Sequence, residues 1–316
     1  MTDSPYWTRA RHADRRPFLL ARAKILAVIR AWFADQGFIE ADVGALVQSP
    51  GAEVHLHAFE TAGRYLHTSP EFALKRLLAA GEDKLFFLGK VYRAGDRGPL
   101  HAPEFTLLEW CRAGAPYEAV QQDCIDIARA ACRAIGAGAL TWRGKACDPF
   151  SEPQRLSVRA AFARYAPPPP CGEGAGGGGD DQPTDVFAKI LVAHVEPNLG
   201  RDRLTFLTEY PITEAALARR KPDDPSVAER FELYACGIEL ANGFGELTDP
   251  IEQRARLEAA MDEKQRRYGV RWPIDEDFLA ALAHMPPASG CALGFDRLVM
   301  LAAGATHIDQ VLWTPP

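Results

Sequence analysis

Residues 84–111 read KLFFLGKVYRAGDRGPLHAPEFTLLEWC, and this stretch carries the strongest fold signal of the chain. Its two ends, from Lys84 to Tyr92 and from Phe105 to Cys111, are rich in aromatic and apolar residues and are predicted to be strands. The segment between them, from Arg93 to Glu104, is charged and contains Gly and Pro, which is typical of a loop. The stretch therefore predicts a strand, a charged loop and a second strand.

Helices and strands follow one another irregularly on both sides of this stretch. Apolar residues recur at helical spacing over residues 14–36, and Gly37 follows where a C-terminal cap is expected. Ser69 is a predicted N-cap, with Pro70 and Glu71 in the first turn. Further helices are predicted at 117–135, 251–268, 275–284 and 296–304, and extended segments at 38–47 and 290–295. Short connections without a strict β-α-β alternation favour an α+β fold with a largely antiparallel sheet flanked by helices.

The composition narrows the class of protein. Of the 316 residues, 47% are hydrophobic and 25% are charged, which is ordinary for a globular protein with a large core. The net charge of −6 and the isoelectric point near 5.8 leave no electrostatic footprint for nonspecific nucleic-acid binding. Seven scattered cysteines without a CxxC pair indicate reduced thiols, and no signal peptide or membrane span is recognisable. We therefore expect a soluble cytoplasmic protein.

One low-complexity segment interrupts the chain. Residues 167–179 read PPPPCGEGAGGGG, a composition that cannot form a packed core. We expect a flexible surface insertion at residues 167–183. Because the motifs on its two sides must cooperate, we expect a single domain at residues 14–316, preceded by a polar leader at residues 1–13.

An acidic stretch indicates a binding cleft. Residues 231–249 read FELYACGIELANGFGELTD and place Glu232, Glu239, Asn242 and Glu246 among small and apolar residues. Burying carboxylates is costly without a cation or strong partners, so the cluster indicates a cleft for a metal ion or a cationic substrate. A strand with one solvated face would explain one such acid, but four polar groups together favour a site.

Two arginine motifs indicate an anion site. Arg93 ends the first strand of the 84–111 stretch, with Arg97 and His101 in the following loop, and a planar guanidinium can grip a phosphate. Arg297 lies in the first turn of the last predicted helix, where free backbone N–H groups favour anions. Each arginine alone could be a surface ion pair. The chain thus supplies acids for an ammonium group and arginines for a polyphosphate separately.

Together these motifs resemble those of class II aminoacyl-tRNA synthetases. Residues 91–110 (VYRAGDRGPLHAPEFTLLEW) resemble motif 2, residues 290–304 (GCALGFDRLVMLAAG) resemble motif 3, and residues 37–50 (GFIEADVGALVQSP) look like motif 1, the usual dimer element. The motifs occur in the same order, and the resemblance covers nearly all of the chain from the first helix onward. It implies a class II synthetase catalytic domain and a homodimer.

The segments TSPEFALKRLL, VEPNLG, VAERFELY and GIELANGF are similar to those of a subgroup. This subgroup comprises short lysyl-tRNA synthetase paralogues that ligate (R)-β-lysine to elongation factor P, and Ala292 stands where it has Ala and lysyl-tRNA synthetases have Gly. Only a short leader and one helix precede the motif 1 region, so we expect no anticodon-binding domain and no action on tRNA. The resemblance implies ATP-dependent formation of a β-lysyl or lysyl adenylate. The acyl group would then pass to the ε-amino group of a lysine on elongation factor P.

The resemblance also implies a role for each matching residue. Arg93 would hold the α-phosphate of ATP and Arg297 the γ-phosphate, and these two are the expected catalytic residues. The other expected contacts are His101 beside the phosphates, Phe105 on the adenine, Glu232 and Glu239 on Mg²⁺, and Ser69, Glu71, Glu109, Asn242, Glu246 and Ala292 around the lysine-type substrate.

Four departures from the family pattern concern the same site. They are Ala94-Gly95-Asp96 where an Asn-Glu pair follows the motif 2 arginine, Ala102 after His101 in place of Asn, Cys111 in place of Tyr, and Gly245 in place of His. The Glu that would read the adenine amino group is therefore absent unless Asp96 substitutes for it. Two alternatives to an active ligase stay open: a truncated synthetase that charges tRNA, and a catalytically silent synthetase-like binding or regulatory protein.

Overall fold

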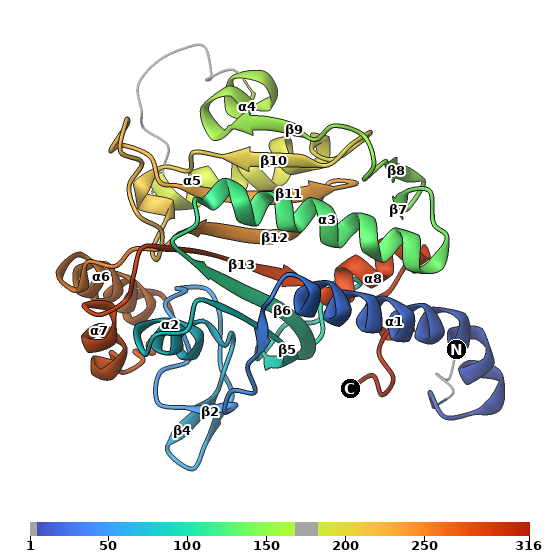
Figure 1. Ribbon diagram of the computed structural model, residues 1–316, viewed down its shortest axis with the longest axis horizontal. Coiled ribbons are helices and arrows are strands. Elements are labelled where there is room, and N and C mark those ends of the chain that lie inside the picture. Colours follow the sequence, from blue (N-terminus) through green and yellow to red (C-terminus); the bar gives the residue numbers. More distant parts are fainter. Residues whose placement is uncertain (1–4, 168–182) are drawn as a thin grey trace.

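An eight-stranded mixed sheet forms the centre of the computed structural model, which describes residues 5–167 and 183–316 (Figure 1). The β1–β5 and β10–β9 pairs are parallel and the other five pairs are antiparallel, so the predicted α+β fold with a largely antiparallel sheet is confirmed. The strands are, in sheet order, β1 (Ile39–Glu40), β5 (Lys84–Tyr92), β6 (Glu104–Ala113), β13 (Ala288–Gly294), β12 (Ile238–Gly245), β11 (Arg230–Ala235), β10 (Thr205–Thr208) and β9 (Gln154–Ser157). Two small sheets contain β2 (Leu46–Val47), β4 (Arg64–Leu66) and β3 (Glu60–Thr61), and β7 (Leu140–Trp142) and β8 (Lys145–Cys147).

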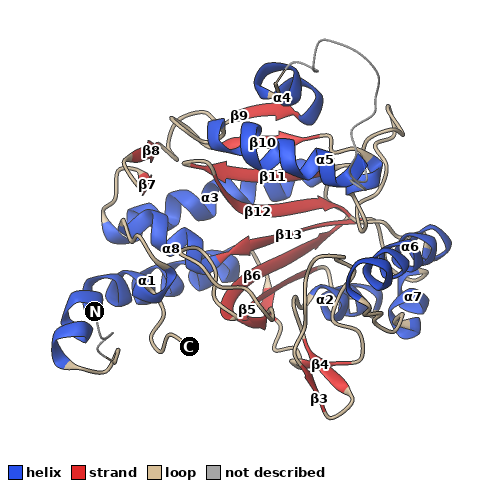
Figure 2. Cartoon of the chain, turned by 180° about the vertical axis from the view of Figure 1, so that it is seen from behind, coloured by secondary structure: helices blue, strands red, loops and turns tan. Residues whose placement is uncertain are grey.

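The two faces of the main sheet carry different helices. The α-helices of the described residues are α1 (Arg9–Asp35), α2 (Glu71–Ala79), α3 (Tyr117–Ile135), α4 (Val158–Tyr165), α5 (Pro183–Ile190), α6 (Pro250–Tyr268), α7 (Glu276–Leu282) and α8 (Phe295–Ala303). Helices α1, α3 and α8 pack on one face and bury the main apolar core there (Figure 1). Seen from behind, α2, α6 and α7 gather beside β5 and β6 at the other side of the sheet (Figure 2). Among the described residues, no helix is long and apolar enough to cross a membrane.

The side chains of strand β6 alternate between the two faces of the main sheet. Successive side chains of a strand point to opposite faces. Leu108 and Trp110 belong to the core under α1 and α3, whereas Phe105 and Cys111 belong to a second apolar cluster that includes residues of α2 and α7. Glu109 shares the parity of this second set, so it projects away from α3. The second face is therefore the one that receives polar residues.

Most predicted boundaries agree with the structure. The helix over 117–135 and the strand over 84–92 have the predicted bounds, and Gly37 follows α1 with a φ of 76°, as a C-terminal cap requires. Helix α1 begins at Arg9, so the expected limit of a leader at residue 13 falls inside a helix. The expected insertion at residues 167–183 lies outside the described residues, except at its two ends.

The acidic stretch folds as a hairpin of β11 and β12. Cys236 and Gly237 form its turn, and both have positive φ angles (58° and 77°), as a tight two-residue turn of this handedness requires. The pairing then shifts: Leu233 lies opposite Ala241, but Tyr234 lies opposite Glu239. Leu240 is thus an extra residue in β12, a β-bulge that reverses the facing of the residues before it.

Candidate functional site

One row of paired residues crosses the middle of the sheet. Glu232 lies opposite Asn242, Asn242 opposite Ala292, and Ala292 opposite Glu109. Side chains at directly opposite positions project from the same face of a sheet. Four residues that the sequence singled out separately, on β11, β12, β13 and β6, therefore lie side by side.

The bulge at Leu240 adds Glu239 to this face. Glu239 and Asn242 are three residues apart, so regular alternation would place them on opposite faces. With Leu240 as an extra residue, Glu239 lies opposite Tyr234, which is two residues from Glu232 and shares its face. The bulge thus reconciles the spacing of the acidic stretch with a single site.

Along the strands, on one side of this row, a buried lysine joins two of the predicted acids at what we call the acidic end of the site. The ammonium of Lys75 on α2 lies 2.6 Å from Glu71 and 2.7 Å from Glu246, and its side chain is fully buried. Glu246 has this position because residue 290 is glycine: a Cβ there would lie 2.5 Å from Glu246 Oε1. The sequence interpretation missed Lys75, although its position four residues after Glu71 on a predicted helix was a usable signal.

Burial raises the pKa values of the acids at this end. The pKa of Glu246 rises to about 7, because burial outweighs the opposing charge of Lys75. Burial also raises the pKa of Glu71, again against Lys75. The pKa of Glu109 lies well above its usual range because of burial and the charge of Glu71, although Ser69 donates a hydrogen bond of 2.6 Å to its Oε1. Burial lowers the pKa of Lys75, but Glu246 and Glu71 together raise it above its ordinary value.

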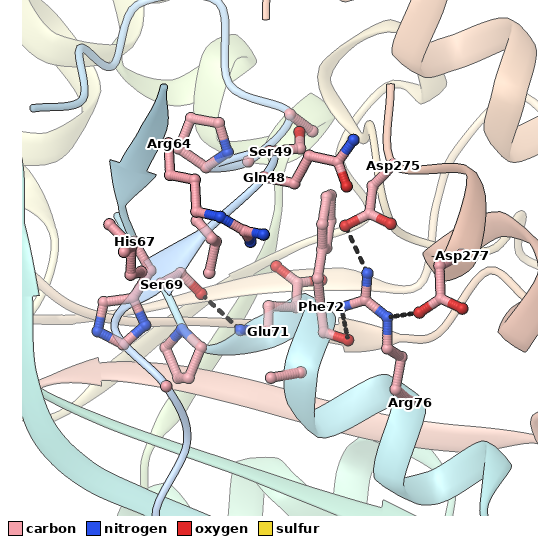
Figure 3. A pocket seen from close by; sticks show the side chains of 18 of the residues that line it. Gln48, Ser49, Arg64, His67, Ser69, Glu71, Phe72, Arg76, Asp275 and Asp277 are labelled. Atoms are coloured by element: carbon pink, nitrogen blue, oxygen red, sulfur yellow. Dashed lines mark hydrogen bonds and ion pairs between the residues drawn. The ribbon is translucent and has the colours of Figure 1, made fainter. Parts of the chain in front are cut away.

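A cavity of about 390 Å³ opens beside the acidic end of the site (Figure 3). Ser69 and Glu71 line it together with Glu53, which lies in the loop between β2 and β3. At its rim, Arg76 bridges Asp275 and Asp277 at 2.5 and 2.7 Å (Figure 3). Neither Arg93 nor Arg297 lines this cavity, so it belongs to the acidic end alone.

The other end of the site, on the opposite side of the row, is basic. Arg297 donates a hydrogen bond of 2.8 Å to the backbone oxygen of Glu239, and its second terminal nitrogen lies 2.7 Å from His101 Nε2. Burial and the adjacent Arg297 charge lower the pKa of His101, which favours the neutral imidazole, whereas Asp96 opposes this shift. The structure therefore brings the predicted motif 2 and motif 3 residues together.

Arg93 has a nitrogen without a partner. Its guanidinium lies 5.0 Å from the centre of the Phe105 ring, while its Nε is buried and makes no hydrogen bond within the described residues. A buried unpaired donor is costly, so a permanently charged group in this state fits an anionic ligand. This is the clearest structural sign that the basic end receives phosphate or carboxylate oxygens.

A buried ion pair anchors the helix that carries Arg297. Asp296 pairs with Arg22 of α1 and accepts a hydrogen bond of 2.7 Å from the backbone N–H of Thr106 on β6. Arg22 also donates to the Thr106 hydroxyl at 2.7 Å. These contacts tie α8 to α1 and β6 and fix the position of the neighbouring Arg297.

The predicted metal ligands differ in accessibility. One oxygen of Glu232 pairs with Arg230 at 2.6 Å and the other accepts hydrogen bonds of 2.5 Å from Tyr210 and Tyr234, whereas Glu239 is partly exposed. The described residues contain no ready group of three His, Cys, Asp or Glu ligands. Mg²⁺ beside phosphates usually takes one or two carboxylates and completes its shell with phosphate oxygens and water, so Glu239 with the remaining lone pair of Glu232 fits it.

Glu196 is an acid that the sequence interpretation missed at this point. It accepts a hydrogen bond of 3.2 Å from Tyr234, and burial, then the charges of Glu232 and Glu239, raise its pKa to about 7. It lies in the VEPNLG segment, so the segment itself was the available signal.

The departure at Gly245 has a structural explanation. A Cβ at this position would lie 2.3 Å from Glu229 and 2.8 Å from Arg219, and these two side chains form an ion pair of 2.5 Å. The Arg219–Glu229 pair therefore occupies the space beside Gly245. At another departure, Gly95 has a φ of 85°, which favours glycine.

Comparisons with known proteins agree with this geometry. The family model described as tRNA synthetases class II (D, K and N) matches residues 4–316, and membership in this class implies the use of ATP. The proteins named elongation factor P–(R)-β-lysine ligase from Hamiltonella defensa, Klebsiella pneumoniae and Vibrio cholerae are 38%, 39% and 36% identical to the chain, each match covering 94% of both sequences. Within the class II synthetases, the chain belongs to the family of these ligases.

Proposed function

We propose that the protein activates (R)-β-lysine, or lysine, with ATP and ligates it to the ε-amino group of a lysine on elongation factor P. The observation that carries this proposal is a site with two ends, one on each side of the row of paired residues. Its acidic end, with Glu71, Glu109 and Glu246, suits a substrate that carries ammonium groups. Its basic end, with Arg93 and Arg297, suits a polyphosphate, and the names of the relatives support the same reaction.

The residues suggest how activation proceeds. A carboxylate oxygen of the amino acid attacks the α-phosphorus of ATP, the bond from that phosphorus to the bridging oxygen breaks, and pyrophosphate leaves. Arg93, with its unpaired buried Nε, binds the α-phosphate and stabilises the charge that develops there, while Arg297 holds the γ-phosphate. Positioning and electrostatics supply the catalysis, so no covalent enzyme intermediate is needed.

The second step transfers the acyl group. The ε-amino nitrogen of the acceptor lysine attacks the acyl carbon, an amide bond forms, and AMP leaves with the adenylate oxygen while the nitrogen gives up a proton. The remaining assignments are Phe105 on the adenine, Asp96 near its amino group, His101 by the phosphates, and Ser69, Asn242 and Ala292 around the amino acid. Mg²⁺ held by Glu239 and Glu232 would neutralise phosphate charge.

The acceptor is tested by intact mass. Purified protein is incubated with ATP, Mg²⁺, each candidate amino acid and either elongation factor P or tRNA. We expect a mass increase of one lysyl unit on elongation factor P and none on tRNA. A product on tRNA would support the truncated-synthetase alternative. If neither lysine supports pyrophosphate exchange and ATP also fails to bind, the silent-protein alternative holds instead.

Amino-acid binding should release a proton near neutral pH. Burial raises the pKa of Glu246 from 4.5 to about 7, so the carboxyl is protonated more readily in the ligand-free fold than in the unfolded chain. Its contribution to the free energy of unfolding is therefore complete below about pH 4.5 and is lost as the pH rises through 7. An ammonium ligand binds the ionised form. Affinity should therefore rise by up to about tenfold per pH unit below pH 7 and level off above it. Calorimetry at about pH 6.5 in two buffers of different ionisation enthalpy measures the released proton; equal enthalpies in both buffers would contradict this linkage.

We also propose a homodimer in which each chain forms a single domain that includes the whole of α1. Ile39 and Leu46, in the motif 1 region, have relative exposures of 57% and 47% in the isolated chain, which suits a surface that a second copy covers. Sedimentation equilibrium of the wild type and of an Ile39→Asp variant distinguishes dimer from monomer. A monomeric wild type would overturn the proposed dimer.

A further inference from the structure

The loop between β5 and β6 brings His101 to the basic end of the site. His101 Nε2 lies 2.7 Å from the guanidinium of Arg297. Gly98 and His101 exchange two backbone hydrogen bonds of 3.2 Å, which close a tight turn at residues 98–101. After this turn, Ala102 is only 2% exposed and belongs to the main apolar core, against which Leu100 also packs. The second half of the loop is therefore docked on the protein before any ligand binds.

A contact with the C-terminal segment fixes the turn of this loop. The short helix η4 (Ile308–Gln310) follows α8, and the N–H of Ile308 donates a hydrogen bond of 2.8 Å to the carbonyl oxygen of Pro99. The Ile308 side chain is 2% exposed and belongs to the same apolar core as Ala102. Because Pro99 lies two residues before His101, this backbone contact determines where the imidazole lies.

A buried arginine of α1 holds the C-terminal segment in turn. Arg15 is 4% exposed, and its guanidinium donates hydrogen bonds to the backbone oxygens of Asp309 at 3.0 Å, of Trp313 at 3.4 Å and of Leu312. The C-terminal segment consequently runs beside α1 (Figure 1). A guanidinium carries five N–H donors in one rigid plane, so it can bond several carbonyl oxygens at once and fix their relative positions.

These contacts connect α1 to the phosphate end of the site. Arg15 holds the C-terminal segment, Ile308 holds Pro99, and His101 lies against Arg297. A loop that is ordered before its ligand arrives loses little conformational freedom when the ligand binds. Without the Ile308 contact, the ligand would have to order residues 97–101 itself, and this cost would appear as weaker binding.

We propose that the turn of residues 306–310 is a positioning element of the ATP site, with Ile308 and Arg15 as its positioning residues. Both residues lie outside the three motif regions of the sequence, and neither contacts the reacting groups of the proposed reaction. This inference rests on the proposed function, since it takes the basic end of the site as the place where ATP binds. The element acts on the affinity for ATP and leaves the chemical step nearly unchanged.

Ile308→Pro tests the backbone contact, because proline lacks the N–H that Pro99 accepts. Proline suits this position: Ile308 is the first residue of η4, and His307 before it is extended, with φ −150° and ψ 140°. The Kd for ATP should rise about tenfold by calorimetry, while the Kd for lysine or (R)-β-lysine should change by less than about twofold. The matched control is Ile308→Val, which also trims this buried side chain but keeps the N–H, and it should bind ATP as tightly as the wild type.

Variants of Arg15 test the second contact. In Arg15→Met, the KM for ATP in pyrophosphate exchange should rise about tenfold, while kcat at saturating ATP falls by less than about twofold. Arg15→Lys keeps a charged donor and should recover part of the lost affinity. Arg16→Met, at the exposed next position of α1, is the control and should change neither constant. A purely structural role of Arg15 would lower the unfolding temperature and the amount of active protein without changing the KM for ATP.

Hydrogen exchange measures the order of the loop directly. The backbone amides of residues 97–102 should exchange faster in ligand-free Ile308→Pro than in the wild type, and saturating ATP should restore most of the protection. Unchanged exchange of these amides would contradict the proposed contact.

The outcomes separate the inference from the proposed function. If the wild type binds ATP and folded Ile308→Pro binds it equally well, the positioning role is wrong and the proposed function stands. Equal losses in Ile308→Pro and Ile308→Val would assign the effect to packing and overturn the role of the N–H. A lower kcat with an unchanged KM for ATP in Arg15→Met would overturn the role of Arg15, and this result decides alone if Ile308→Pro does not fold. If the wild type binds no ATP, the proposed function and this inference fail together.

Discussion

Replacing Glu246 by alanine is expected to abolish use of the cationic amino acid and to leave ATP binding nearly intact. Glu246 is 2% exposed and lies 2.7 Å from the Lys75 ammonium, at the acidic end of the site, which is remote in strand register from Arg93. Losing a carboxylate that pairs with a buried substrate ammonium costs about 2–5 kcal/mol of binding, which corresponds to a loss of about thirtyfold or more in amino-acid-dependent kcat/KM. Pyrophosphate exchange with varied amino acid and varied ATP measures the two effects separately.

The same change leaves Lys75 with only one acidic partner, so stability has to be controlled. Glu246→Gln keeps the volume and should lose amino-acid use with a smaller effect on thermal unfolding. A triple variant, Glu246→Ala with Lys75→Met and Glu71→Gln, removes all three charges of this cluster and should unfold closer to the wild-type temperature than Glu246→Ala alone. Glu118→Gln, an exposed acid in the first turn of α3, is the control for an unspecific charge effect. Equal loss of amino-acid and ATP binding in Glu246→Gln would contradict the assigned role.

Sequence reasoning went furthest where local chemistry decides the structure. The helix over 117–135 and the strand over 84–92 have strong periodicity or strong strand composition, and the structure has the same bounds. The cap at Gly37 rests on a single backbone conformation that glycine adopts readily. Such features need no knowledge of the rest of the fold.

The arrangement of the acidic stretch could not be read in the same way. Asn242 and Glu246 are four residues apart and can share one face of a regular strand, but Glu239 and Asn242 are three apart and cannot. The bulge at Leu240 resolves this, but the bulge depends on pairing between β11 and β12, and no local pattern specifies it. The sequence thus predicted the residues of the candidate site, and the strand register shows which of them share one face.

Counter-charges were the main omission. The sequence indicates acids for a cation, but it does not indicate that Lys75 pairs with Glu71 and Glu246. Nor does it indicate that Arg230 pairs with Glu232. The sequence interpretation also missed Glu53 and Glu196, which belong to no dense cluster in the sequence. These contacts bring together residues that are far apart along the chain, so only the folded arrangement reveals the net charge of each end of the site.

The largest effect at the basic end is expected for Arg297→Ala, which should abolish ATP-dependent exchange and leave amino-acid binding nearly unchanged. Arg297 lies in the first turn of α8, whose N-cap Gly294 offers no side-chain cap, so we expect the free N–H groups and the guanidinium to bind the same anion. Removing a charged donor from such a phosphate site should cost about 100- to 1,000-fold in kcat. Exchange kinetics and ATP calorimetry provide the measurement.

Two variants make this result specific to the guanidinium. Arg297→Lys keeps a positive charge but lacks the planar guanidinium, which can donate to the Glu239 backbone oxygen and to a phosphate at the same time. It should therefore recover only part of the activity. Arg254→Ala removes an arginine from exposed ion pairs with Glu258 and Glu276 and should change nothing, because exposed pairs contribute little. Arg297→Ala also removes the arginine neighbour of Glu239, so weaker Mg²⁺ binding has to be separated from the loss of a phosphate contact. If Arg297 binds the nucleotide itself, added Mg²⁺ should not restore exchange. Recovery by Mg²⁺ alone would mean that the arginine orders Glu239 and does not itself bind the nucleotide.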